Sequence, residues 1–313
     1  MEFNSVNSVT QYKTPVALFI FNRPDVTSQT FSRIAMIKPE VLLIISDGAR
    51  SFVEGEQVLV ERTRKIIDNV NWPCKLITNF SERNLGCRNR MITGISWVFE
   101  NVSEAIILED DCLPTLTFFE FVEEMLNKYR NSSDVFSIAG SCFTGDTTAD
   151  GHLLSEYSLM WGWATWSNRW LKYDADAKGY KSIVFSKWWN KPIDCLYWMA
   201  VFRNIKNGSL NSAWDYQWIL TLWREHAKCV RPTVNLVENI GFGPDATHTK
   251  SGSRFDLIGK YTGSVGELRH QVTDRDSLGR YSNADRRLWA MINIKTVLLL
   301  FIPMLARFKR TKN

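Results

Sequence analysis

Three consecutive acidic residues, Glu109, Asp110 and Asp111, form the densest group of side chains that could do chemistry. They follow an apolar run at 105–108, and neighbouring carboxylates repel one another unless a cation or hydrogen-bond donors lie close by. Mg²⁺ and Mn²⁺ take one or two protein carboxylates and complete their coordination with phosphate oxygens and water. Ribose hydroxyls also donate to carboxylates. The triplet therefore indicates a site for a metal-bound nucleotide diphosphate, with an exposed acidic turn as the alternative.

Other polar residues follow two more apolar runs. Asn22 and Arg23 come after residues 15–21, and Asp47 comes after residues 41–46. Asp47 could accept a hydrogen bond from a base or a ribose hydroxyl. Arg23 could pair with a phosphate, hold Asp47, or form a purely structural salt bridge. A nucleotide diphosphate would use all of these groups together.

The elements that must position these residues can be read from the apolar pattern. Buried strands are predicted at 15–21, 41–46, 74–78, 105–108 and 135–139, and helices at 26–36, 55–69, 87–99 and from 114–117 onward. Strands that alternate with helices through short loops predict an α/β fold, a doubly wound, mostly parallel sheet flanked by helices. Ligands of such sheets bind outside the carboxyl ends of the strands. The fold should therefore bring Asn22, Arg23, Asp47 and the acidic triplet to one edge.

The composition is that of a globular protein. The 313 residues are 45% hydrophobic, and 38 basic against 33 acidic residues give a net charge of +5. This balance excludes disordered, collagenous and coiled-coil classes, and the mild charge does not indicate a nucleic-acid partner. The six cysteines lack metal-site spacing, and the first fourteen residues lack an apolar signal segment. We therefore expect a cytoplasmic protein with reduced thiols.

Tryptophan is abundant, with 13 residues. Trp161, Trp163, Trp166 and Trp170 lie close together around Gly162, which would allow a close backbone approach. They predict a stacking platform for a sugar donor or acceptor, and one or two of the four should touch ligand. The alternative is a packed aromatic core.

A second carboxylate of interest, Asp215, lies between Trp214 and Trp218. An apolar setting raises the basicity of a carboxylate, so Asp215 is a candidate general base. Its alternative role is to cap a helix at 216–225. Arg88 or Arg90, at the start of the helix at 87–99, could stabilise a leaving diphosphate.

The last part of the chain differs in character. Residues 297–306 carry no charge, and basic residues flank them: Lys295, Arg307, Lys309, Arg310 and Lys312. Ten residues are too few to span a bilayer. A basic apolar helix in a C-terminal extension at 256–313 would suit an anionic membrane surface, or else pack on the core. Residues 1–14 are predicted to be extended or disordered, and 15–255 to form one domain with a nucleotide-binding half (15–140) and an acceptor half (141–255).

The order of these motifs resembles a known family. The run ILEDD, then Leu113 and Pro114, then the aromatic segment FFEFVEEML resembles nucleotide-diphospho-sugar glycosyltransferases of the GT-A fold. The resemblance is closest to the N-acetylglucosaminyltransferase I type and its bacterial relatives. It implies that Asp111 ligates Mn²⁺ and that Glu109 and Asp110 face the ribose and the transferred sugar. It also implies that Arg23 and Asp47 hold the base.

The resemblance extends through the second half, over about 15–250. The segment SAWDYQW at 212–218 is similar to the segment that carries the family's catalytic base, which implies that role for Asp215, with Trp214 beside the acceptor. Residues 229–248 resemble a loop that closes over the donor, and His248 would be a second metal ligand. The family's N-terminal membrane stem has no counterpart here, and residues 141–211 match only loosely.

We therefore predict a Mn²⁺- or Mg²⁺-dependent inverting glycosyltransferase. It would transfer a sugar, UDP-linked as the resemblance implies, to a hydroxyl of a glycan or glycolipid acceptor. The setting would be bacterial surface polysaccharide synthesis (O-antigen lipopolysaccharide or capsule), with the enzyme peripheral at the inner face of the cell membrane. One alternative is a sugar nucleotidyltransferase, against which the glycine-free loop at 21–24 argues. The other is a non-catalytic carbohydrate-binding protein at a membrane surface.

Overall fold

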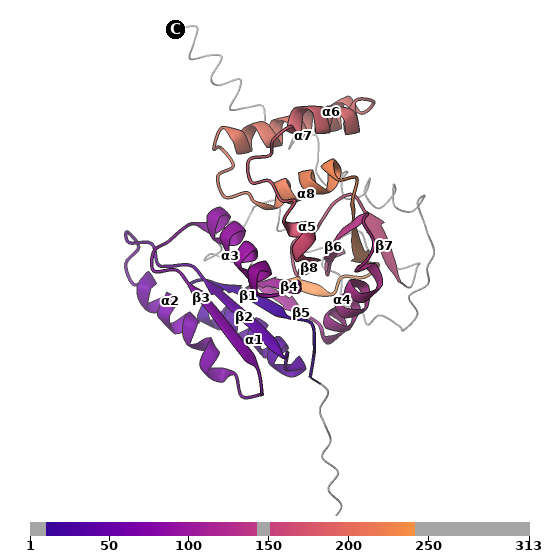
Figure 1. Cartoon of the computed structure of the whole chain (residues 1–313). Coiled ribbons are helices and arrows are strands. Elements are labelled where there is room, and N and C mark those ends of the chain that lie inside the picture. The colour runs from indigo at the N-terminus through magenta and orange to yellow at the C-terminus, as the bar shows by residue number, and fades with distance from the viewer. Residues whose placement is uncertain (1–10, 143–150, 242–313) are drawn as a thin grey trace, which may run out of the picture.

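The computed structural model describes residues 11–142 and 151–241 (Figure 1). Eight strands form one mixed sheet in the order β3-β2-β1-β4-β8-β6-β9-β7. Their bounds are β1 Val16–Ile20, β2 Val41–Ser46, β3 Lys75–Phe80, β4 Glu104–Glu109, β6 Val135–Ala139, β7 His152–Ser155, β8 Trp163–Trp166 and β9 Lys228–Pro232. Two short strands, β5 (Cys112–Pro114) and β10 (Val237–Asn239), pair separately.

Six of the eight strands point the same way. β1 to β4 are mutually parallel, with Val16 opposite Leu42 on one side and opposite Ile106 on the other. β8 runs antiparallel between β4 and β6, β9 is parallel to β6, and β7 is antiparallel at the edge. The predicted α/β class with a mostly parallel sheet is confirmed.

The helices in the first half lie where the sequence pattern predicts them. They are α1 (Pro24–Ile37), α2 (Glu56–Arg64) with a 3₁₀ turn η1 (Lys65–Asn69), α3 (Cys87–Asn101) and α4 (Leu116–Tyr129). Pro24 occupies the first helical position of α1, where its missing N–H costs nothing. Thr115 caps α4, because its Oγ1 accepts from the Phe118 backbone N–H at 3.1 Å.

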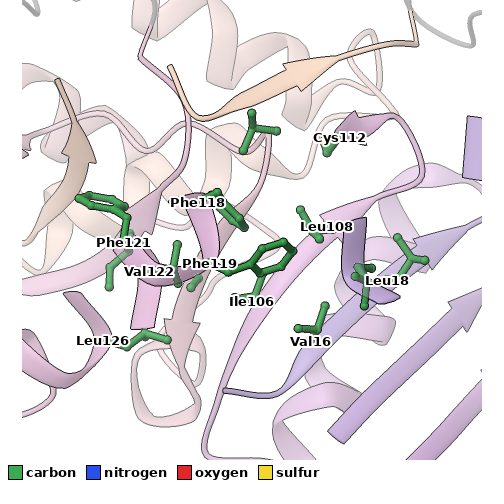
Figure 2. Packing of buried hydrophobic residues seen from close by; sticks show 14 of the residues in the cluster. Val16, Leu18, Ile106, Leu108, Cys112, Phe118, Phe119, Phe121, Val122 and Leu126 are labelled. Carbon is green, nitrogen blue, oxygen red and sulfur yellow. The ribbon is translucent and has the colours of Figure 1, made fainter. Parts of the chain in front are cut away.

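Both faces of the central strands are buried. In β1, Val16, Leu18 and Ile20 pack toward α1 and α4, while Ala17 and Phe19 pack toward α3 on the opposite face. Figure 2 shows part of the first cluster, where Phe118, Phe119 and Val122 of α4 lie over the strands. This burial explains why the strands read as continuous apolar runs without alternation.

The sequence pattern did not resolve most of the elements after residue 140. Besides β7 and β8 the structure has α5 (Ser167–Trp170), α6 (Tyr180–Trp188), α7 (Pro192–Lys206) and α8 (Asp215–Arg224). Helices α6, α7 and α8 enclose a third, largely aromatic cluster and lie beyond one end of the sheet (Figure 1). The helix considered at 216–225 is present as α8, Asp215–Arg224.

Several predictions fall on residues that the structure does not describe. They concern His248, the first ten residues and the C-terminal extension at 256–313. Within the described ranges, no helix combines the length and apolar character needed to cross a bilayer.

Candidate functional site

The reversal of strand order between β1 and β4 brings the predicted site together. β1 has β2 on one side and β4 on the other, and a crevice at such a reversal is where parallel sheets bind ligands. Arg23 leaves the end of β1 and bridges to the acids at the end of β4. Its Nη2 lies 3.0 Å from Asp111 Oδ2 and also contacts Asp110 Oδ1, and its Nε lies 3.4 Å from Asp110 Oδ2. Arg23 therefore does not hold Asp47, one of the roles predicted for it.

The acidic triplet carries more negative charge than its protein surroundings balance. Burial, then the charges of Asp111 and Asp110, raises the pKa of Glu109 to about 8. Burial also raises the pKa of Asp110 to about 6 against the opposing effect of Arg23. The pKa of Arg23 is raised, because the two aspartates more than offset the lowering effect of burial. One arginine against three carboxylates leaves a site suited to a further cation.

Asp47, at the end of β2, already accepts hydrogen bonds from the protein's own donors at both carboxylate oxygens. Its Oδ1 accepts from the backbone N–H groups of Gly48 and Leu85, both at 2.9 Å. Its Oδ2 accepts from the Gly86 N–H at 3.0 Å and from Asn84 Nδ2 at 3.2 Å. Asp47 is buried, so it clamps the loop that leads into α3. Direct contact of Asp47 with a nucleotide base stays a prediction.

Asn22 is also tied to the protein. Its Nδ2 donates to Glu56 Oε1 at 2.8 Å, and the buried Glu56 is in turn held by the backbone N–H and guanidinium of Arg50. Burial raises the pKa of Glu56, yet the bonds from Arg50 outweigh it and the net shift is downward. Asn22 therefore anchors the β1 edge to the start of α2. Sequence reasoning missed Arg50 and Glu56, which carry no motif.

Cys87 shows that carboxylates from three segments converge. This thiol begins α3, and burial raises its pKa to about 12, with further contributions from Glu109, Asp215, Asp47 and Asp111. The charge of Asp215 also acts on Glu109. Asp215 thus lies within electrostatic reach of the acidic triplet, although about a hundred residues separate the two in the chain. Sequence reasoning assigned Cys87 no role.

Asp215 begins α8, and Trp214 occupies the N-cap position without a side-chain cap bond. The helix-cap alternative for Asp215 therefore does not describe the structure. Tyr173 lies beside it: its hydroxyl donates to the Trp214 carbonyl at 2.9 Å, and Asp215 contributes to raising the pKa of Tyr173. Arg88 acts on the same tyrosine in the opposite sense, and its Nη2 donates to the Ala175 carbonyl at 2.6 Å.

Arg88 has one unsatisfied donor. Its buried Nε has no hydrogen-bond partner in the structure. Since an unpaired buried donor of a charged group is costly, this N–H is available to an anionic ligand. Arg90, the other candidate, also has a buried Nε without a hydrogen-bond partner, and its Nη2 donates to Asn79 Oδ1 at 2.8 Å. Arg88 acts on Tyr173 beside Asp215, whereas the charges that act on Arg90 are those of Asp47 and Arg64. The predicted phosphate role therefore suits Arg88 better than Arg90.

Gly241 lies against the site from the other side, and it belongs to the segment at 229–248 that the resemblance likened to a loop over the donor. β10 pairs with β5 directly after the triplet, with Asn239 opposite Cys112, and the Ile240 N–H donates to the Asp111 carbonyl at 2.9 Å. A Cβ at Gly241 would lie 2.2 Å from Asp111 Oδ2 and 2.8 Å from Asp111 Cβ. The backbone at Gly241 therefore lies directly against the Asp111 side chain.

The tryptophan platform requires correction. Trp163 lies in β8, and Trp163 and Trp214 are both buried with their ring centroids 6.0 Å apart. Trp166 and Trp170 are buried as well, so these four rings form core and offer no open face. Trp161 is partly buried and remains a candidate. Gly162 has a φ of +62°, and a Cβ there would lie 2.7 Å from Val237, so packing accounts for this glycine.

The metal prediction rests on oxygen chemistry. Among residues 11–142 and 151–241, no three or more His, Cys, Asp or Glu side chains are grouped as metal ligands. With a diphosphate present, however, Mg²⁺ and Mn²⁺ need only one or two protein carboxylates. Asp111 is partly exposed at the edge of a site with surplus negative charge, so the donor set fits such an ion.

Comparisons with known proteins give little further guidance. No protein-family model matches the sequence, and no curated protein matches it. Solved structures with some similarity include a cytidylyltransferase from Leptospira borgpetersenii serovar Hardjo-bovis, at 10% identity and a TM-score of 0.31, covering 52% of this chain and 64% of that one. They also include UDP-glucose pyrophosphorylase complexed with UDP-glucose, at 8% identity and a TM-score of 0.33, covering 70% and 90% of the two chains.

A third is a UTP-bound UDP-glucose pyrophosphorylase (UGPase) from Acinetobacter baumannii, at 6% identity and a TM-score of 0.33, covering 70% of this chain and 86% of that one. At these TM-scores the likeness carries no argument about activity. The resemblance to glycosyltransferases therefore stays a prediction. The doubly wound fold rests on the strand order itself.

Proposed function

We propose that this chain is a nucleotide-sugar-dependent transferase that moves a sugar from a nucleotide diphosphate to an acceptor hydroxyl. The observation that carries the proposal is the convergence at the β1–β4 reversal: Arg23 bridges Asp110 and Asp111, and the charge of Asp215 acts on Glu109 from the opposite half of the domain. A leaving diphosphate needs groups that balance its charge, and a hydroxyl nucleophile needs a base.

In this proposal the chain's own residues divide the work. Arg23 and the donor of Arg88 Nε would face the diphosphate, and Asp111 would hold a Mn²⁺ or Mg²⁺ ion that neutralises charge on the leaving group. Asp215 would take the proton of the acceptor hydroxyl as its oxygen bonds to the anomeric carbon. The bond from that carbon to the diphosphate breaks, and its electron pair leaves with the diphosphate. Attack from the opposite face inverts the anomeric centre.

A sugar nucleotidyltransferase is the second candidate. UDP-glucose pyrophosphorylases are among the similar solved structures, and the substrates share a nucleotide and a sugar phosphate. Two observations favour sugar transfer instead. The β1–α1 connection has no glycine. A sugar phosphate is already an ionised nucleophile and needs no base, which would leave Asp215 without a role.

The test is a calorimetric titration of the full chain with UDP-, GDP- and dTDP-sugars, with and without Mn²⁺. We expect one donor to bind in the presence of metal, with loss of binding in Asp111→Ala. Asp215→Asn should keep donor binding and lose turnover by about 10²- to 10⁴-fold, measured as UDP released. Formation of pyrophosphate from UTP and a sugar 1-phosphate would establish the second candidate. Binding of free glycans alone, with no nucleotide, would favour the non-catalytic alternative.

The cellular setting belongs to the same proposal. A glycan or glycolipid acceptor at the inner membrane face, in surface polysaccharide synthesis, is supported by the resemblance and by the basic apolar run at 297–306. An acceptor series with free and lipid-linked glycans, scored by UDP release, would separate the acceptor classes.

A further inference from the structure

Four large apolar side chains are exposed at one end of the α6–α7 hairpin. The exposed fractions are 62% for Phe185, 68% for Trp189, 55% for Ile193 and 55% for Leu196. The two helices are in contact and only residues 189–191 join them, so they run antiparallel. Phe185 and Leu196 each lie about one helical turn from this connection. The four side chains therefore share the hairpin tip, and this name is used for them below.

The outward direction of the hairpin tip is fixed by what the helices bury on their other face. Val184 and Trp188 of α6 and Tyr197, Trp198 and Val201 of α7 pack against α8 in the third core cluster. Figure 1 shows α6 and α7 beyond the end of the sheet, away from β1, β2 and β3. Since the buried face is already used, nothing within the described residues covers the tip.

The charge on the two helices of the hairpin indicates the kind of partner that could cover the tip. From the start of α6 to the end of α7 there are five basic residues and one acidic residue, Asp194, a net charge of 5 − 1 = +4. The whole chain carries only +5. Lys181, Lys191, Arg203 and Lys206 are exposed, whereas Lys187 is paired with Glu156 at 2.8 Å. Of these exposed cations Lys191 lies at the tip, and Lys181, Arg203 and Lys206 lie further along the two helices. The hairpin as a whole thus combines an exposed apolar tip with a net positive charge.

We propose that the hairpin tip docks on an anionic phospholipid surface. The apolar side chains would enter the headgroup boundary, where tryptophan is favoured, and the lysines would face the lipid phosphates. Two other occupants are less suited. A second copy would bring two basic surfaces together, and the chain's own apolar run at 297–306 is itself flanked by basic residues. The proposal does not depend on the transferase activity.

Vesicle binding of the full chain tests the proposal. We expect it to co-sediment with vesicles that contain phosphatidylglycerol and not with pure phosphatidylcholine. The double variant Phe185→Ser/Trp189→Ser should lower the partition coefficient by about tenfold or more, since two large side chains lose their burial. Phe52→Ser is the matched control, because Phe52 is 83% exposed but precedes α2. Unchanged binding of the double variant would overturn the proposal.

Fluorescence quenching separates the hairpin tip from the C-terminal tail. Among the residues that the structure describes, Trp189 is the only tryptophan whose side chain is largely exposed. Quenching by brominated lipids should be lost in Trp189→Phe, which keeps the tip apolar, and kept in Trp289→Phe. The reverse result would assign the contact to the tail and overturn the proposal. Donor binding measured without vesicles should be unchanged in all of these variants, so the two proposals can fail independently.

Discussion

Replacing Gly241 by alanine tests whether the position of Asp111 matters. The new methyl group would lie 2.2 Å from Asp111 Oδ2 and 2.8 Å from both Cβ and Cγ. Non-bonded carbon and oxygen atoms rarely approach within about 3 Å, so Asp111 must move by roughly 1 Å. Rotation of the side chain alone cannot relieve the clash, because Asp111 Cβ is fixed to the backbone that bonds to Ile240.

The consequence for activity follows from the tolerance of catalytic geometry. A displacement of about 1 Å at a charge-bearing group costs on the order of 10²-fold in rate. Overpacking at one position lowers the free energy of unfolding by about 1 to 3 kcal/mol. We therefore expect Gly241→Ala to fold, to lose about 10²-fold in kcat/KM for sugar transfer, and to require more Mn²⁺ for donor binding.

The assay is UDP release with the donor found by calorimetry, together with urea unfolding of each variant. Gly208→Ala is the control: Gly208 follows α7 at a φ of +77° with nothing within 4 Å, so its substitution strains the backbone without a clash with any side chain. Gly208→Ala should lower the free energy of unfolding and leave kcat/KM unchanged. If Gly241→Ala kept wild-type kcat/KM, the assignment of Asp111 to the reacting site would be refuted.

Two further predictions concern the loop that leads into α3 and the thiol of Cys87. Asp47→Ala should lower the free energy of unfolding by about 3 kcal/mol or more, because four donors lose their acceptor. Asp47→Asn keeps one oxygen acceptor and should lower it less. Equal losses of the two variants in urea unfolding would contradict the role of Asp47 in holding the loop into α3. Cys87 is partly accessible, yet burial and the nearby carboxylates raise its pKa to about 12 and keep it a thiol at pH 8. Iodoacetamide should therefore modify it about 10³-fold more slowly in the native than in the urea-unfolded chain, with the rate rising as the pH rises. Equal rates by peptide mass spectrometry would contradict the raised pKa.

The sequence predicted the parallel half of the fold well because its strands are buried on both faces. VALFI in β1 and VLLIIS in β2 contain no charged residue, and the turn residues after them mark the sheet edge. That edge placement, combined with the rule for parallel sheets, was enough to predict that Arg23 and the acidic triplet meet. Both β2 and β4 lie beside β1, and Arg23 pairs with Asp110 and Asp111 while Asp47 is bonded to the loop that leads into α3. The residue types do not specify this choice of partners.

The second half was harder for a physical reason. Helix α6 buries Val184 and Trp188 but exposes Phe185, so its apolar residues do not follow one helical stripe. Trp163 was read as a ligand platform because aromatic residues serve both cores and sugar sites, and only its place in β8 distinguishes the two. The contact of Gly241 with Asp111 arises from the β5–β10 pair, whose strands of three residues each leave no periodic signal.

The charge balance at the β1–β4 reversal also distinguishes the two candidate reactions. Nucleotidyl transfer brings a sugar phosphate and a nucleoside triphosphate to an edge that already holds three carboxylates, Asp215 and one bridging arginine. Sugar transfer brings one diphosphate and a neutral hydroxyl, which adds less negative charge and gives Asp215 a proton to accept. Burial, and then the charges of Asp111 and Asp110, raise the pKa of Glu109, so a further anion at this edge would be unfavourable without a cation. Sugar transfer brings fewer negative charges to this edge than nucleotidyl transfer does, so it needs fewer additional cations there.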